Sequence, residues 1–96
     1  MTATRVGDWF FLGGQRTSNL NSAAASLTLP TGTDTVMLIA EGGVVRYTIN
    51  GTATATSYGY VAEDTGQIIG PFSNLASLSV YGGAGVYANA IYLKNK

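Results

Sequence analysis

The chain has 96 residues, of which 46% are hydrophobic and only 10% are charged, and its formal net charge is zero. Charged residues make up about 25% of an average soluble domain, and a small domain with few charges and no net charge tends to associate. The sequence therefore predicts one domain over residues 1–96, with much of its surface covered by other subunits in a homo-oligomer or a larger assembly.

The residue types that are absent exclude most enzyme classes. The chain has no His and no Cys, which removes histidine-activated nucleophiles, thiolate metal sites and disulfides. Glu63 and Asp64 form the one adjacent acidic pair, but neighbours in a strand point to opposite sides, and in a turn they are solvated. We therefore predict a protein that is not an enzyme, has no catalytic residues, and binds no cofactor or metal ion.

The sequence also argues against nucleic acid and membranes as partners. Its three Arg and two Lys are scattered singly, so no basic stripe is available to neutralise phosphates. Residues 65–93 carry no charge over 29 positions, but their glycines and polar side chains make them too polar for a membrane span. The N-terminus has no basic region followed by an apolar core, so we expect no signal peptide.

The chain is expected to begin with an arm and a strand. Residues 1–4 are predicted to be a loose arm, and residues 5–12 alternate as a strand requires. Trp9 and Phe10 would lie on opposite faces of this strand, which predicts burial on both sides, by the core and by a neighbouring subunit. A glycine pair at residues 13–14 is expected to end the strand.

Residues 15–22 are predicted to form a polar loop, and the segment that follows is ambiguous. Four apolar residues at helical spacing fit a helix that begins near Ser18. Alternation over residues 24–29 instead fits a strand, and Pro30 favours extended geometry in the residue before it. We favour the strand over the helix.

The middle of the chain predicts a central strand followed by a hairpin. Residues 34–41 are apolar on both parities and should lie centrally in a sheet. Residues 44–49 alternate as a half-buried strand, and Asn50-Gly51 suits a two-residue type I′ turn. That turn is favoured over use of the Asn-Gly-Thr sequon for glycosylation. Residues 52–56 would lead into a second, tyrosine-rich strand, in which Gly59 predicts a bulge or a close backbone approach.

The rest of the chain completes an all-β pattern. Further strands are expected at residues 58–62, 67–72, 75–81 and 86–93, with turns or loops between them. About eight short strands at roughly ten-residue spacing are typical of an antiparallel sandwich or barrel. The predicted fold class is all-β, a single antiparallel β-sandwich of the jelly-roll or Ig-like kind.

The remaining candidates for function are aromatic side chains and one isolated cation. Arg46 is the only charge between Glu41 and Glu63, and it could be an exposed strand cation, a partner in an ion pair between subunits or a ligand contact. Exposed Tyr and Trp suit either protein interfaces or stacking against sugars. The interface candidates are Trp9, Phe10, Arg46, Tyr58, Tyr60, Tyr81 and Tyr87.

Several short motifs over residues 34–93 occur together: a strand with Val-Arg-Tyr, a turn ending in Gly-Thr, a Thr/Ala segment, a Tyr/Gly strand and a late LxSLxV strand. In this combination the chain resembles a group of small bacteriophage virion proteins, in which the central segment commonly reads VRYRxDGTxPTAxxG. Arg46-Tyr47, Asn50-Gly51-Thr52 and Ala55-Thr56 sit in matching places, with Asn50 where Asp is usual and alanine where Pro is usual.

The resemblance implies a capsid decoration or cement protein with a β-sandwich fold. Such a subunit would bind the major capsid protein or other virion proteins, stabilise the head, and reside in the virion after synthesis in the cytoplasm of the host bacterium. The string Tyr-Thr-x-Asn-Gly-Thr also resembles Ig-like accessory domains of carbohydrate-active enzymes, although the Pro-Thr that usually follows is missing. That second resemblance implies a small carbohydrate- or receptor-binding module instead.

Overall fold

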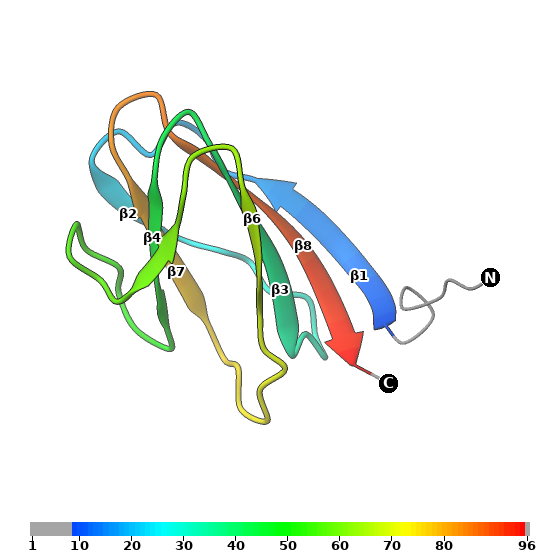
Figure 1. The fold of residues 1–96 in the computed structure, drawn as a ribbon. Coiled ribbons are helices and arrows are strands. Elements are labelled where there is room, and N and C mark those ends of the chain that lie inside the picture. The colour runs from blue at the N-terminus through cyan, green and yellow to red at the C-terminus, as the bar shows by residue number, and fades with distance from the viewer. Residues whose placement is uncertain (1–8, 96) are drawn as a thin grey trace.

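The computed structural model describes residues 9–95, and within this range it contains strands and no helix. Eight strands form two four-stranded antiparallel sheets that pack face to face (Figure 1). The strands are β1 (Trp9–Arg16), β2 (Ala23–Ser26), β3 (Thr35–Glu41), β4 (Val45–Ile49), β5 (Gly59–Val61), β6 (Gly66–Ile69), β7 (Leu78–Gly82) and β8 (Tyr87–Asn95). The predicted β-sandwich is confirmed.

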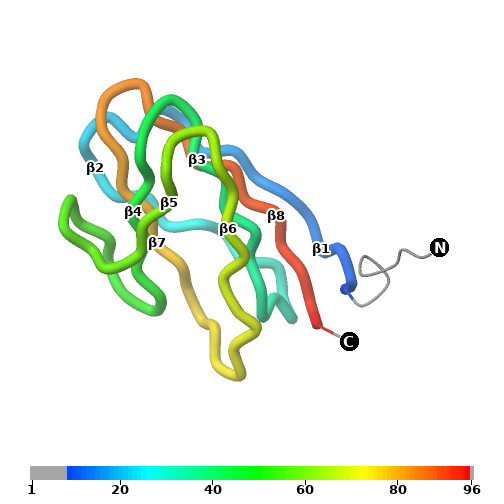
Figure 2. The backbone as a smooth tube through the Cα atoms, viewed as in Figure 1, coloured from blue at the N-terminus to red at the C-terminus, as the bar shows by residue number. Residues whose placement is uncertain are grey.

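The strand order identifies the kind of sandwich. Sheet A has the order β1-β8-β3-β6, and sheet B has the order β2-β7-β4-β5. Apart from the β4–β5 connection, successive strands alternate between the two sheets, and Figure 2 shows the backbone passing back and forth between them. Two four-stranded sheets connected in this order form a jelly roll, which decides between the two predicted topologies.

The core lies between the sheets, where every second residue of each strand points inward. In β8 the inward residues are Ala88, Ala90 and Tyr92, all at most 2% exposed. Because residues in a strand alternate between its faces, the intervening side chains of β8 point outward. The other core side chains are mainly aliphatic, among them Val36, Leu38, Val45, Val61, Ile69, Leu78 and Val80. The strands predicted over residues 75–81 and 86–93 therefore have their apolar faces as expected.

The first strand ends later in the chain than predicted, at Arg16 and not at Leu12. Its glycine pair does not end it, because the pairing with β8 shifts register between Phe11 and Gly13 and then continues through Gln15 and Arg16. Such a bulge absorbs one extra residue and bends the strand without ending it. The loop predicted to begin at Gln15 is therefore wrong by two residues. The arm predicted over residues 1–4 and the first part of this strand lie outside the described residues.

The helix considered near Ser18 is wrong, and the strand alternative is confirmed in a shorter form. Asn21 and Ser22 have φ angles of 51° and 63°, in the left-handed region that breaks a right-handed helix. The chain then pairs along β7, with Ala23 opposite Gly82 and Ser26 opposite Ser79. Pairing with β7 therefore overrides the helical spacing of the apolar residues.

The hairpin predicted at Asn50-Gly51 is also corrected. Asn50 does have a positive φ of 55°, but β5 begins only at Gly59, so residues 50–58 form a long loop and residues 52–56 are not a strand. The Asn50 side chain accepts hydrogen bonds from the backbone N–H groups of Ala76 and Ser77, at 2.8 and 3.0 Å. It therefore anchors the segment before β7, a long-range role that the local motif does not reveal.

Candidate functional site

The outer side of sheet A carries a continuous apolar surface. In β8, Ile91 and Leu93 point away from the core, and the strand pairing places Ile91 beside Met37 and Leu93 beside Phe11. Ile68 of the edge strand β6 lies on the other side of Met37. We call this surface the apolar face; its residues are Trp9, Phe11, Met37, Ile39, Ile68, Ile91 and Leu93.

In the single chain two residues of the apolar face are exposed and the other five are half-buried. Phe11 is 71% exposed and Ile68 is 54% exposed. Four strands about 4.8 Å apart, over about five residues of about 3.4 Å each, give a footprint of about 300 Å². An exposed apolar patch of this size on a monomer is often an interaction site. The apolar face is therefore the first candidate site.

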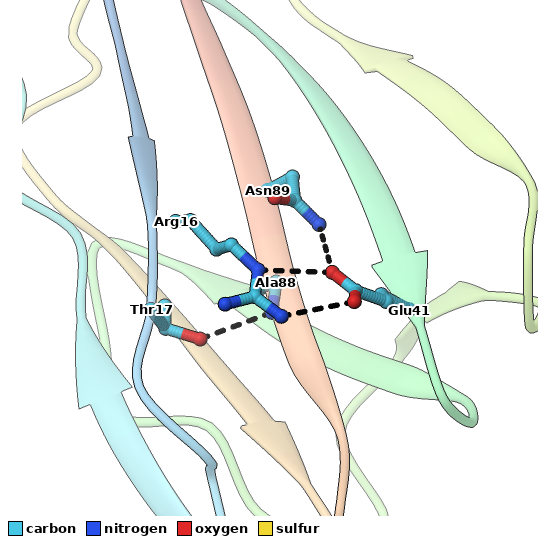
Figure 3. A network of polar contacts seen from close by, with 5 residues as sticks. All are labelled: Arg16, Thr17, Glu41, Ala88 and Asn89. Carbon is cyan, nitrogen blue, oxygen red and sulfur yellow. Dashed lines mark hydrogen bonds and ion pairs between the residues drawn. The ribbon is translucent and has the colours of Figure 1, made fainter.

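An ion pair closes one end of the apolar face (Figure 3). Arg16 of β1 donates two hydrogen bonds to the Glu41 carboxylate of β3, from Nε at 3.0 Å and from NH2 at 2.9 Å. Asn89 of β8 lies between them and donates to the same carboxylate at 3.1 Å. The Arg16 guanidinium also lies 4.1 Å from the ring centroid of Tyr87. Its charge is thus matched by a bidentate carboxylate and an aromatic ring at once.

This arrangement strongly perturbs the acid. The hydrogen bond from Arg16, followed by the one from Asn89, lowers the pKa of Glu41 from 4.5 to about 2. The same hydrogen bond raises the pKa of Arg16. Both side chains are about half exposed, so the pair adds little to stability in water. Its chief effect is that the two charges cancel on the sheet surface.

The outer side of sheet B has a different character. The strand pairing places Tyr60 of β5, Arg46 of β4, Tyr81 of β7 and Ala24 of β2 side by side across the sheet. We call these four residues the Arg46 row. The Arg46 guanidinium lies 4.8 Å from the ring centroid of Tyr60, and its NH1 donates to the backbone oxygen of Ser57 at 3.2 Å. Tyr60 is 49% exposed.

The loop of residues 50–58 bounds the Arg46 row on one side. Ala53 donates its backbone N–H to Ser79 Oγ at 2.9 Å, and Thr48 Oγ1 donates to Ser57 Oγ at 2.9 Å. These bonds hold the loop over the next cross-strand row, which Thr48 and Ser79 form. The loop buries Ser79 and leaves the hydroxyls of Thr48, Thr54, Thr56 and Ser57 beside the Arg46 row; we call these four the hydroxyl margin.

Tyr58 of this loop contacts Tyr47, which packs against the core from β4. Tyr58 is 68% exposed, and its hydroxyl accepts the backbone N–H of Ile49 at 2.8 Å. Its ring meets Tyr47 edge to face, with 6.2 Å between centroids. Burial, and then the neighbouring Tyr58, raise the pKa of Tyr47. The Tyr47 ring lies where a Cβ at Gly59 would stand, so the group that approaches Gly59 is a side-chain ring and not the backbone predicted from the sequence.

The structure separates the interface candidates predicted from the sequence into two groups. Strand pairing puts Trp9 and Tyr87 on the outer side of sheet A. Arg46, Tyr60 and Tyr81 meet on sheet B, and Tyr58 lies on the adjoining loop. Phe10 is 51% exposed and alternates with Phe11, so it lies on the opposite side of β1 from the apolar face.

Sequence reasoning missed most of the apolar face. Six of its seven residues were not among the candidates: Phe11, Met37, Ile39, Ile68, Ile91 and Leu93. The available signal was that the strands over residues 34–41 and 86–93 are apolar on both parities. Only the strand order shows that their outward residues lie side by side.

Three further observations bear on the kind of site. Among residues 9–95, no three His, Cys, Asp or Glu side chains gather where a metal ion could bind. The described part of the chain also has no helix with the length and apolar character needed to cross a membrane. Comparisons with protein families, with curated proteins and with solved structures found no match to this chain.

Proposed function

We propose that the protein is a non-enzymatic structural subunit of a bacteriophage virion, a capsid decoration protein that binds the major capsid protein. The observation that carries this proposal is the apolar face, a sheet surface that no other part of the described chain covers and that has the Arg16–Glu41 ion pair at one end. The resemblance of the chain to phage virion proteins over residues 34–93 supports the same function, and so does its low charge content.

The size of the apolar face favours a partner that makes several contacts. Stable protein interfaces bury about 800 Å² on each side, well above the footprint of about 300 Å² that four strands provide. A single pair of such faces would therefore associate weakly. A subunit on a capsid can add contacts to several capsid proteins and to its own copies, and avidity from these contacts strengthens attachment without a larger face.

The jelly-roll fold is compatible with this function. Jelly rolls occur in viral capsid proteins, and also in lectins and cupins, so the fold alone does not select a function. In this chain it presents a flat, four-stranded surface with little charge. Such a surface can clamp neighbouring capsid subunits by burying apolar area, at about 25 cal/mol per Å².

A charge at the centre of the apolar face tests the proposal. Ile91→Asp should weaken binding to particles by about 100-fold or more, because burying an unpaired carboxylate in an apolar interface costs about 3 kcal/mol or more. Phe11→Ser provides a second variant, since Phe11 is largely exposed in the free chain and its loss should not affect folding. Binding is measured by co-sedimentation with purified virions of the phage or prophage that encodes the chain.

Ser26→Asp is the matched control, because it places the same charge on the exposed outer side of sheet B. It should co-sediment as the wild type does. Equal binding by wild type, Ile91→Asp and Phe11→Ser would contradict the proposal. A wild-type chain that remains a monodisperse monomer and never sediments with particles would also contradict it.

A further inference from the structure

Unlike Arg16, Arg46 has no carboxylate partner among residues 9–95, and this difference points to a ligand. A guanidinium carries five N–H donors in a planar fork that suits a carboxylate. Within residues 9–95, Arg46 makes one hydrogen bond, to the Ser57 carbonyl, and has no ion pair. A half-buried cation on a sheet surface thus retains most of its donors.

The contacts of Arg16 indicate which kind of partner the Arg46 guanidinium lacks. Both arginines lie over a tyrosine ring, Arg16 over Tyr87 and Arg46 over Tyr60. Arg16 also holds the Glu41 carboxylate through two hydrogen bonds. The partner that Arg46 lacks is therefore a carboxylate, the planar anion that matches its donors in pairs.

The surroundings of Arg46 indicate what would carry that carboxylate. Tyr60 and Tyr81 pair with Arg46 from the strands on either side of β4, so a group bound to Arg46 would have a tyrosine on each neighbouring strand. The margin beside them consists of Ser and Thr hydroxyls, including Thr54 and Thr56 of the loop. Protein interfaces are depleted in Ser and Ala and have an apolar centre, whereas the outward residues near Arg46 on β2 and β4 are small or polar: Ala24, Ser26 and Thr48.

We infer that the Arg46 row is a binding site for acidic sugars, in which Arg46 holds the carboxylate of a uronate residue and Tyr60 or Tyr81 lies against its ring. Tyr58 and the hydroxyls of the loop extend the surface for a neighbouring sugar. The inference does not rest on the proposed capsid function, because it uses other residues. The two sites are compatible, since the outer sides of sheets A and B face in opposite directions (Figure 1).

Titration of the ¹⁵N-labelled protein with tri-galacturonate, followed by NMR, tests the site. We expect shifts in the Nε–H resonance of Arg46 and in backbone amides of β4, β5 and β7, and none in those of β1. Maltotriose, a neutral sugar of the same length, should cause no comparable shift. Arg46→Gln should reduce tri-galacturonate affinity by about tenfold or more, because a charge-assisted pair of hydrogen bonds is lost.

Two further variants distinguish binding at the Arg46 row from nonspecific attraction of the anionic sugar to the protein. Tyr60→Ala should weaken binding several-fold through lost stacking, and Arg16→Gln, which removes the cation of the other sheet, should leave it unchanged. Equal binding of maltotriose, or no loss of affinity in a folded Arg46→Gln protein, would overturn the inference. Tighter binding of the acidic tripeptide Glu-Glu-Glu than of tri-galacturonate would also overturn it, because the site would then serve an acidic protein partner.

Discussion

The two outer sheet surfaces use the same pair of residue types in different ways. Each carries an arginine over a tyrosine ring, Arg16 over Tyr87 on sheet A and Arg46 over Tyr60 on sheet B. On sheet A the guanidinium is neutralised by Glu41, and the apolar face lies beside this ion pair. On sheet B no carboxylate pairs with the guanidinium within the described residues, and hydroxyls surround it.

This difference indicates which surface can be buried against a protein. A paired and hydrogen-bonded charge can enter an interface at modest cost, whereas an unpaired charge is expensive to remove from water. A partner protein can therefore bury the entire apolar face together with the Arg16–Glu41 ion pair at its end. The Arg46 row can be covered only by a partner that supplies a negative group. The same physical rule thus favours docking through sheet A and ligand binding through sheet B.

The largest loss of stability is expected from a substitution at Gly59, the glycine of β5 that faces Tyr47. A Cβ there would overlap the ring of Tyr47, which packs against Tyr58 beside the Arg46 row. Gly59→Ala should lower the free energy of unfolding by about 1–3 kcal/mol, as overpacking does. The measurement is urea-induced unfolding followed by tryptophan fluorescence.

Gly83→Ala is the matched control for this change. A Cβ at Gly83 would meet no atom within 4 Å, so its stability should stay within about 0.5 kcal/mol of the wild type. If Gly59→Ala proved as stable as Gly83→Ala, the Tyr47 ring would not be held over Gly59. The contact between Tyr47 and Gly59 would then not form in solution as it does in the structure.

A smaller effect is expected from the ion pair on sheet A as the pH falls. The pKa of Glu41 is lowered to about 2 in the folded protein, from an ordinary value of 4.5. The stabilisation from this group is therefore present above about pH 4.5 and is lost as the pH falls through about 2. The melting temperatures of wild type and Glu41→Gln should differ at neutral pH and converge below pH 4.5.

The control for this pH experiment is the same Glu41→Gln substitution made in an Arg16→Gln chain. In an Arg16→Gln chain the first cause of the lowered Glu41 pKa is missing, so adding Glu41→Gln should change the melting temperature with much less dependence on pH. A gap between wild type and Glu41→Gln that persists unchanged to pH 2 would show that Arg16 and Glu41 are not paired in solution.

The smallest effect expected is a gain of binding on sheet A. Glu41→Gln leaves Arg16 over Tyr87 without its carboxylate, the same condition as Arg46 in the wild type. The variant should therefore acquire weak binding of tri-galacturonate, seen by NMR as shifts of the Arg16 Nε–H resonance that the wild type does not show. Absence of any shift would mean that an unpaired arginine over a tyrosine is insufficient, and that the hydroxyl margin of sheet B is essential.

The sequence pattern predicted the inward faces of the later strands, but it did not predict which side chains share an outer sheet surface. Period-two alternation predicts the inward residues of β7 and β8, because burial of one face imposes it. It does not predict that β1 continues past Gly14, since a bulge depends on the partner strand. Nor does it predict the contact between Arg16 and Glu41, which lie on strands separated by β8.

The Arg46 row was partly predictable. Arg46, Tyr60 and Tyr81 were all candidates, but strand pairing across three strands was needed to show that they lie together. The Asn50-Gly51 motif was misleading because it is local, whereas the Asn50 side chain bonds to residues 24 to 27 positions away. Residues that act through distant partners are the ones for which pattern reasoning fails.

Hydroxyl-radical footprinting of the protein, free and bound to purified virions, is the most direct test of the opposite roles of the two sheets. Met37 and Phe11 report on the apolar face, and Tyr58 and Tyr60, both about half exposed or more, report on sheet B. We predict that oxidation of Met37 and Phe11 falls on binding while that of Tyr58 and Tyr60 is unchanged. Protection of the two tyrosines with continued oxidation of Met37 and Phe11 would contradict docking through sheet A.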